Sequence, residues 1–317
     1  MTRLQDDAVS RLREAAGGPE LPPDRYELRS LVGRGGMGAV YSAFDRRLDR
    51  EVALKVSNGA TPASGLEERL RREASVLARL EHPGIVPVHD AGELRDGRWF
   101  YVMKRVHGLT LTEHAPTLSG EAAILGVFER IAQTVAFAHD AGVVHRDLKP
   151  SNVMVGRFGE VLVLDWGVAK ILGTAPVPSL PAPATALADG TAAGTRIGTA
   201  GFMAPEQERG DAMTATPASD VYSLGALLSW MLKGVTPRRR LRAIIAKCLQ
   251  PSPSDRYPDA AALAADLSRY RAGLPVEAHP ESAPERAWRW AEKYRTFILL
   301  ILAYLIMRAA FAWYSRG

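Results

Sequence analysis

The sequence predicts an α+β fold in two lobes, with a small strand-rich N-terminal part and a mostly helical C-terminal part. Segments that alternate apolar and polar residues, as strands do, fill much of positions 26 to 103 around one amphipathic helix. Helical periodicity dominates from position 121 onward. The chain has 317 residues, 47% hydrophobic and 24% charged, which suffices for one large bilobal domain or two smaller domains.

Composition excludes several classes of protein. The single cysteine, Cys248, rules out an internal disulfide framework and most cysteine-based metal sites, and its apolar helical surroundings predict core packing. Residues 1–13 lack the continuous apolar core of a secretory signal, so we expect no export of the folded part. Residues 1–25 form an N-terminal tail and linker in this interpretation.

The position of the positive charge argues against nucleic-acid binding. The formal net charge is +5, and the segment from Arg286 to Gly317 alone holds six basic residues and one acidic residue. The rest of the chain is therefore neutral. Basic residues beside an apolar run are typical of proteins that meet an anionic membrane surface.

The first strand, Tyr26 to Val32, leads into the glycine-rich segment Gly33-Arg34-Gly35-Gly36-Met37-Gly38. This G-x-G-x-x-G pattern alone could also open a dinucleotide-binding helix. Ala39 to Ala43 instead alternates as a second strand, so the glycines form the tip of a hairpin. Glycines let a backbone approach phosphate groups without side-chain clashes.

The following elements alternate between strand and helix. A third strand, Glu51 to Ser57, carries Lys55 among apolar neighbours, and Leu66 to Leu80 forms an amphipathic helix that includes Glu73. Ile85 to His89 and Arg98 to Val102 are two further strands.

The chemically richest segment is the loop from Val144 to Asn152, which follows an amphipathic helix from Glu121 to Ala141. It places the carboxylate of Asp147, the ammonium of Lys149 and the carboxamide of Asn152 within six positions. Phosphoryl transfer requires a carboxylate for a hydroxyl proton, a cation near the moving phosphate and oxygen ligands for Mg²⁺. A short strand, Val161 to Leu164, then leads to Asp165-Trp166-Gly167.

In their order along the chain, these motifs resemble those of bacterial eukaryotic-like (Hanks-type) serine/threonine protein kinases. The resemblance covers roughly residues 26–271 and implies the bilobal protein-kinase fold, with an N-lobe at 26–103, a hinge at 104–106 and a C-lobe at 107–271. It implies Asp147 as catalytic base, Lys149 at the γ-phosphate, and Lys55 paired with Glu73 at the α- and β-phosphates. Asn152 and Asp165 would hold Mg²⁺. The family usually has Phe where Trp166 stands, and Trp can fill the same apolar position.

The resemblance also implies how ATP would lie. The backbone groups of Lys104 and Val106 would bond adenine, and Met103 would be the gatekeeper beside them. Val40, Ala53 and Met154 would enclose the ring, although core packing explains these apolar residues equally well. The glycines expected over the phosphates are Gly33, Gly35, Gly36 and Gly38.

Residues 165–206 correspond to the activation segment of the family. Thr191 and Thr195 are the candidate phosphorylation sites, because a phosphothreonine there could pair with Arg146. Thr199 would face the protein substrate. Two architectural contacts are also implied: Glu206 with Arg256, and Asp220 with the backbone of the catalytic loop.

The pattern departs from the family after the helix at 221–232. Only Lys233 to Arg240 precede the next helix, Leu241 to Leu249, so one helix of the family is missing and the C-lobe is shortened. This favours, as an alternative to an active enzyme, a pseudokinase-like scaffold that binds nucleotide with impaired substrate docking. Arg238, Arg239, Arg240 and Arg242 form either a docking patch for acidic partners or a solvated face.

The C-terminal part is predicted to reach a membrane. A basic juxtamembrane linker at 272–295 precedes an apolar run at 296–314, which is interrupted only by Arg308 and flanked by Trp and Tyr residues. We expect a single-pass transmembrane helix with the kinase domain in the cytoplasm, the alternative being a helix that lies on the membrane.

The sequence therefore predicts a membrane-associated protein kinase. It would transfer the γ-phosphate of ATP to Ser or Thr hydroxyls of proteins, with Mg²⁺ as cofactor and with autophosphorylation of its activation segment. ATP, protein substrates and the membrane are the expected partners, a homodimer is left open, and nucleic acid is not expected.

Overall fold

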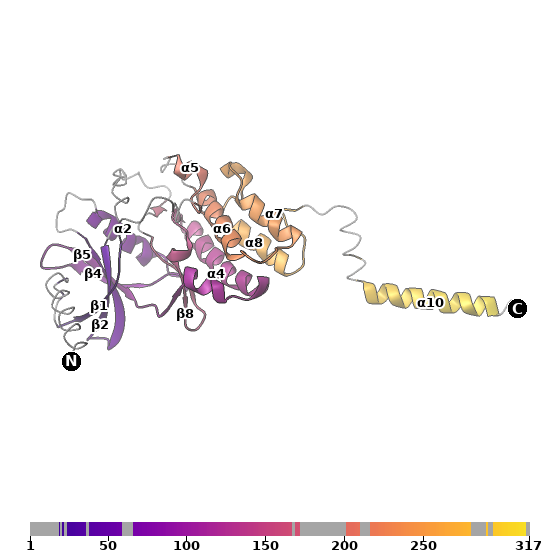
Figure 1. Ribbon diagram of the computed structural model, residues 1–317, viewed down its shortest axis with the longest axis horizontal. Helices are drawn as coiled ribbons and strands as arrows, with labels where there is room; N and C mark the ends of the chain where they lie inside the picture. Colours follow the sequence, from indigo (N-terminus) through magenta and orange to yellow (C-terminus); the bar gives the residue numbers. More distant parts are fainter. Residues whose placement is uncertain are drawn as a thin grey trace.

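The structure is a computed structural model, and it describes residues 19, 21, 24–35, 38–58, 66–166, 169–171, 201–209, 216–279, 290 and 294–314. Figure 1 shows a strand-rich N-terminal lobe, drawn in indigo and violet, beside a helical lobe in magenta and orange. The predicted α+β architecture with two lobes is confirmed. Three predicted residues of the activation segment, Thr191, Thr195 and Thr199, lie outside the described residues, as does Gly36.

The N-lobe is a five-stranded antiparallel sheet with helix α2 on one face. The strand order is β1-β2-β3-β5-β4. Its elements are β1 (Tyr26–Arg34), β2 (Gly38–Asp45), β3 (Arg50–Ser57), α2 (Leu66–Arg79), β4 (Val88–Glu93) and β5 (Trp99–Lys104).

The alternation of β5 shows how the sheet separates two cores. Trp99 and Tyr101 belong to the large hydrophobic cluster that α2 joins through Leu70 and Leu77. Phe100 and Val102 belong to a second cluster on the opposite face. Successive side chains of a strand point to opposite faces, so this short strand contributes to both.

One predicted strand boundary is wrong. We expected a strand from Ile85 to His89, but β4 begins at Val88 and runs to Glu93. Proline has no N–H to donate to a sheet ladder, and Pro87 stands immediately before the observed start. Ile85 instead forms an isolated parallel bridge with Val163 in the other lobe.

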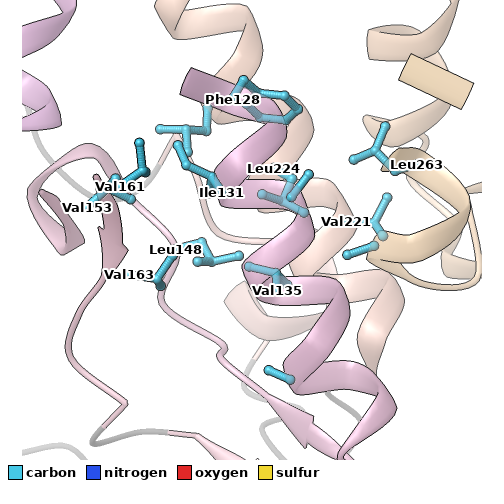
Figure 2. Close-up of a cluster of buried hydrophobic side chains, with 14 of the residues drawn as sticks. Phe128, Ile131, Val135, Leu148, Val153, Val161, Val163, Val221, Leu224 and Leu263 are labelled. Atoms are coloured by element: carbon cyan, nitrogen blue, oxygen red, sulfur yellow. The ribbon is translucent and has the colours of Figure 1, made fainter. Parts of the chain in front are cut away.

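The C-lobe is built around helix α4, with α6 and α8 packed against it. Figure 2 shows Phe128, Ile131 and Val135 of α4 between the strand residues Val153 and Val163 on one side and Leu224 of α6 on the other. The elements are β6 (Gly108–Thr110), α3 (Leu111–His114), η2 (Ala115–Thr117), α4 (Gly120–Asp140), β7 (Val143–Val144), η3 (Pro150–Asn152), β8 (Val153–Gly156), β9 (Val161–Val163), β10 (Lys170–Ile171), α5 (Pro205–Glu208), α6 (Pro217–Met231), α7 (Arg239–Cys248), η4 (Pro253–Asp255) and α8 (Ala260–Arg271).

The shortened connection in the C-lobe is present as predicted. Helix α6 ends at Met231 and α7 begins at Arg239, with a turn and no helix between them. The two helices pack closely, because a Cβ added at Gly225 would lie 2.4 Å from the Cβ of Cys248. Cys248 is buried, which confirms its predicted place in the core. Helix α6 begins four residues earlier than expected, with Thr216 as N-cap and Pro217 in its first turn.

The predicted C-terminal helix forms as α10 (Arg295–Tyr314), which Figure 1 shows apart from both lobes. Within the part of the chain that the structure describes, no helix combines the length and the apolar character needed to cross a membrane. The predicted transmembrane span at 296–314 is therefore not confirmed.

Candidate active site

Lys55 and Glu73 form a buried ion pair between β3 and α2. Leu54 and Val56, on either side of Lys55, point to the outer cluster of the sheet, so the lysine side chain points to the face that α2 covers. Its Nζ lies 2.8 and 2.7 Å from the two carboxylate oxygens of Glu73. The Asp165 carboxylate is 3.6 Å from the same Nζ. The pairing expected from the sequence is thus present.

A residue that the sequence analysis missed completes this cluster. Tyr101 of β5 is 1% exposed, lies opposite Lys55 in the register of β3 and β5, and lines the same cleft as Lys55 and Glu73. Burial raises the pKa of Glu73, whereas Lys55 and the Tyr101 hydroxyl favour the ionised carboxylate. Burial and the nearby Glu73 hold the pKa of Tyr101 well above its usual range, so this hydroxyl keeps its proton. The alternation of Trp99, Tyr101 and Met103 along β5 is the sequence signal that could have placed Tyr101 on the cleft side.

Helix α6 holds the catalytic loop, residues 144–152, through the side chain of Asp220. The Asp220 carboxylate accepts hydrogen bonds from the backbone N–H groups of His145 at 2.7 Å and Arg146 at 2.8 Å. It also accepts from Nε2 of His139 at 2.9 Å, because Nδ1 of that ring accepts from the Ala260 N–H. Arg146 has a φ of +74°, a left-handed conformation that costs energy for a side chain of this size. The Asp220 bonds hold it there, as the predicted bracing role requires.

Asp147, Lys149 and Asn152 converge as the loop predicts. Nζ of Lys149 lies 2.7 Å from the Asp147 carboxylate. The Asn152 amide donates to the Asp147 backbone carbonyl at 2.8 Å and to its carboxylate at 3.1 Å. Lys149 and Asn152 therefore orient the Asp147 carboxylate. Because this carboxylate is also partly exposed, a hydroxyl group can still reach it.

Trp166 is buried in the turn that follows β9 and anchors the neighbouring Asp165. The side chain is 1% exposed, its indole N–H donates to the Val163 carbonyl at 3.1 Å, and its ring centroid lies 4.6 Å from that of His145. The expectation that Trp fills an apolar position is confirmed. Asp165 adopts a φ of +61° and reaches Lys55 from this anchored turn.

A cleft of about 870 Å³ opens between the lobes at these residues. A Cβ at Gly38 would lie 2.3 Å from the Val56 carbonyl oxygen, so only glycine permits this approach of β2 to β3. Asp147 and Lys149 are not among the lining residues, and Asn152 connects them to the cleft. The predicted ATP and metal residues that line it are Gly33, Gly35, Gly38, Val40, Ala53, Lys55, Glu73, Met103, Lys104, Val106, Asn152, Met154 and Asp165.

The oxygen donors in the cleft fit Mg²⁺ bound together with a nucleotide. Asn152 and Asp165 both line the cleft and offer a carboxamide and a carboxylate oxygen. Among the described residues, no group of three or more His, Cys, Asp or Glu side chains could hold a metal ion alone. Mg²⁺ is commonly bound by one or two protein oxygens together with substrate phosphates and water, so this sparse donor set suits it.

The end of the activation segment is tied to the C-lobe by a buried pair. The Arg256 guanidinium contacts the two Glu206 oxygens at 2.8 and 2.9 Å. Ser219 donates to the same carboxylate at 2.8 Å. The contact between Glu206 and Arg256 that the sequence resemblance implied is confirmed.

Proteins named as serine/threonine-protein kinases match most of this chain. It is 36% identical to serine/threonine-protein kinase PknD of Protochlamydia amoebophila over 250 residues, which are 73% of this chain and 25% of that protein. It is 35% identical to serine/threonine-protein kinase PknB of Mycobacterium leprae over 291 residues, which are 80% of this chain and 44% of that protein. The chain thus spans less than half the length of these curated relatives.

The fold agrees with a solved kinase domain. The crystal structure of the PknI kinase domain of M. tuberculosis superposes with a TM-score of 0.57 at 24% identity, covering 78% of this chain and 96% of that one. At this identity the match shows the fold alone. The family model for the protein kinase domain matches residues 26–251, which together with the geometry above shows that the chain belongs to the protein kinase family.

Proposed function

We propose that this chain is a serine/threonine protein kinase that transfers the γ-phosphate of ATP to protein hydroxyls with Mg²⁺. The observation that carries the proposal is the convergence of Lys55, Glu73 and Asp165 in one cleft, beside Asp147. The names of the relatives support serine and threonine as acceptors. Members of this family use ATP and Mg²⁺, and the oxygen donors of the cleft suit both.

Each side chain has a distinct part in the proposed reaction. Asp147 accepts or orients the proton of the substrate hydroxyl, and Lys149 beside it places a positive charge near the transferred group. Glu73 holds Lys55 toward the interior of the cleft, where the ammonium binds phosphate oxygens. Mg²⁺, when bound, neutralises charge that develops on the phosphates. Asn152 and Asp165 would hold it.

The test is transfer of labelled phosphate from Mg²⁺-ATP by the purified chain to itself and to a generic acceptor protein. Asp147→Asn and Lys55→Met should each lower the rate by about a hundredfold or more, since they remove the base and the phosphate-binding cation. Asp96→Asn, at an exposed turn that does not line the cleft, is the matched control. Equal labelling by all four proteins would mean that a contaminating kinase does the work.

The same reaction locates the modified residues. We propose Thr191 and Thr195 as autophosphorylation sites and Thr199 as the residue that faces the substrate. Mass spectrometry of the labelled wild-type protein should find phosphate on Thr191 or Thr195 and none on Thr199. A phosphate confined to residues outside 165–206 would contradict this assignment.

A scaffold without phosphate transfer is the second candidate, because the connection between α6 and α7 is too short for a helix. In protein kinases this region helps dock substrates. The scaffold is favoured if the protein binds Mg²⁺-ATP yet labels neither itself nor any acceptor. A scaffold without catalysis has no need to keep Lys55, Asp147 and Asp165 together. Because this chain has all three, we rank the scaffold second.

We further propose that α10 holds the protein at a cell membrane, with the kinase domain on the cytoplasmic side. Nine large apolar side chains between Phe297 and Met307 are more than half exposed, a costly arrangement in water. Basic residues before the helix suit an anionic surface.

Deletion of residues 296–317 should release the protein from membranes and leave autophosphorylation intact. Alkaline carbonate washing separates the two modes of attachment, because it extracts a helix that lies on the surface and not one that spans. Membrane association that persists after the deletion would contradict the proposal. Whether the protein forms a homodimer stays a prediction.

A further inference from the structure

Gln207 connects the end of the activation segment to the catalytic loop. It belongs to the short helix α5, and its side-chain amide donates a hydrogen bond to the backbone carbonyl of Arg146 at 3.1 Å. The amide oxygen of the same side chain accepts from the Ala204 N–H at 3.4 Å. A flipped amide would place two donors together at one end and two acceptors at the other, so these partners fix its orientation. Arg146 immediately precedes Asp147, the proposed catalytic base.

The backbone of Arg146 is held on both sides of its Cα atom. Its φ of +74° is a left-handed conformation that costs free energy for a residue with a long side chain. The Asp220 carboxylate accepts from the N–H groups of His145 at 2.7 Å and Arg146 at 2.8 Å, so it fixes the backbone before this Cα. Gln207 binds the carbonyl that follows it. Because φ and ψ are the only soft rotations between the two flanking peptide planes, holding both planes fixes both angles.

The peptide unit that Gln207 holds leads directly to the proposed base. The carbonyl of Arg146 and the N–H of Asp147 belong to one planar unit. This N–H donates to Nδ1 of His145 at 3.3 Å, which is longer than the bond from Gln207 to the carbonyl. A rotation of the unit would turn the Asp147 carboxylate away from Lys149, whose Nζ now lies 2.7 Å from it. The bond from Gln207 opposes that rotation.

Helix α5 places Gln207 because the preceding residue is anchored in the C-lobe. Glu206 is buried, and it is held by Arg256 at 2.8 and 2.9 Å and by Ser219 at 2.8 Å. Gln207 itself is half-buried and does not line the ATP cleft. Its reach to the catalytic loop therefore depends on the docking of α5 and on no contact within the cleft.

We propose that Gln207 is a positioning residue for the catalytic base, because its bond to the Arg146 carbonyl orients Asp147 and makes this orientation depend on the docking of α5. This inference rests on the proposed kinase function, since Asp147 is the base of that reaction. It assigns Gln207 no contact with substrate, nucleotide or metal. When α5 is not docked, every catalytic side chain is still present, but Asp147 lacks one constraint on its backbone.

The first test compares two glutamine-to-methionine variants of the full chain. Gln207→Met removes the donor to Arg146, and the matched control Gln250→Met removes an amide that donates to the Ala246 carbonyl at 3.1 Å, just after α7. We measure kcat and the KM for ATP by transfer of labelled phosphate to a generic acceptor protein. Gln207→Met should lower kcat about tenfold, as expected for one lost hydrogen bond, and leave the KM for ATP unchanged. An equal fall of kcat in Gln250→Met, or a change in KM alone, overturns the proposal.

Gln207→Glu separates the bond to the loop from the capping of α5. A carboxylate still accepts from the Ala204 N–H and suits the first turn of a helix, but it cannot donate to the Arg146 carbonyl. If the bond to the loop matters, kcat should fall in Gln207→Glu as it does in Gln207→Met. A fall in the methionine variant alone would show that Gln207 only caps α5, and the proposal would be wrong. Should Gln207→Met not fold, the comparison of Gln207→Glu with Gln250→Glu decides in the same way.

Amide hydrogen exchange gives a measurement that does not depend on turnover. The N–H groups of residues 145–147 are bonded to Asp220 and to the His145 ring. They should exchange about tenfold faster in Gln207→Met than in Gln250→Met, because the loop can then open locally. Unaltered exchange at these residues would contradict the proposal. Absence of phosphate transfer by the wild type would refute only the kinase assignment, since the exchange still shows whether Gln207 holds the loop.

Discussion

At the scale of single residues, the buried pair of Glu206 and Arg256 shows how this protein accommodates a charge in its interior. Arg256 is the clearest example, because its guanidinium contacts Glu206 and also donates to the carbonyls of Ala218, Gln250 and Pro251. A buried ion pair stabilises a fold only when its remaining donors are satisfied, and here they are. The group joins the end of the activation segment to the loop after α7.

Removing one partner of this pair should be severe. Glu206→Gln leaves the buried Arg256 charge without a counter-ion, and we expect a loss of about 3–5 kcal/mol in the free energy of unfolding. Urea unfolding at pH 7 measures it. Glu27→Gln is the control, because Glu27 pairs with Arg46 at 2.9 Å in an exposed position and should cost less than about 1 kcal/mol. Equal losses in the two variants would contradict the special role of burial.

The same pair predicts how the free energy of unfolding changes with pH. Burial alone would raise the pKa of Glu206, but the bonds from Arg256 and Ser219 outweigh it and lower the pKa below its ordinary 4.5. A carboxyl with a lowered folded pKa contributes stability above 4.5 that is lost as pH falls through the folded value. Unfolding curves between pH 3 and 6 should therefore show less acid dependence in Glu206→Gln than in the wild type.

At the scale of elements, helix α8 is bonded to the backbone of the segment that follows it. We expected a linker from residue 272, yet Val276 is buried and the segment to His279 packs on α8. Asp266 of α8 holds it by accepting from the N–H groups of Glu277 at 2.6 Å and Ala278 at 3.0 Å. The Tyr257 hydroxyl donates to the same carboxylate at 2.6 Å.

Neutralising this carboxylate should free the segment. Asp266→Asn replaces an acceptor by a donor opposite N–H groups, so we expect a loss of about 2–4 kcal/mol and faster amide hydrogen exchange at residues 276–279. Asp259→Asn is the matched control on the same helix. Asp259 caps α8 by accepting from the Ala262 N–H at 2.8 Å, and Asn caps nearly as well as Asp. Unaltered exchange in Asp266→Asn would show that other contacts hold the segment.

Features with a local sequence signal or a family motif were predicted, whereas other features that depend on contacts between elements were not. Lys55, Glu73, Asp147, Asn152 and Asp165 were predicted because the motifs that carry them resemble, in their order along the chain, those of protein kinases. Helices and strands were found from periodicity, whereas their ends depended on local signals such as Pro87 and Pro217. Asp266 was missed because its partners, Tyr257, Glu277 and Ala278, lie outside helix α8.

At the scale of the whole molecule, the two lobes share one core on one side and are separated by the cleft on the other. The large hydrophobic cluster includes Leu70 of α2, Phe128 of α4 and Leu267 of α8. The polar residues of the cleft come from both lobes, with Lys55 on β3 and Asp165 after β9. A ligand bound between them should therefore stabilise the molecule as a unit.

The stabilisation should require metal and nucleotide together. A non-hydrolysable ATP analogue with Mg²⁺ at a hundred times its Kd should raise the free energy of unfolding by about 2.7 kcal/mol. Mg²⁺ alone should have little effect, because the described residues hold no cluster of three metal-binding groups. Thermal unfolding with Mg²⁺, with nucleotide and EDTA, and with both separates the contributions.

Asp165→Asn decides whether the metal binds where we place it. The substitution removes the negative charge that faces the metal and keeps the size of the side chain, so the increment that Mg²⁺ adds to the nucleotide should shrink while the effect of nucleotide in EDTA remains. Asp96→Asn at the protein surface should keep both. A full Mg²⁺ increment in Asp165→Asn would show that the metal does not bind at this carboxylate and that other residues hold it between the two lobes.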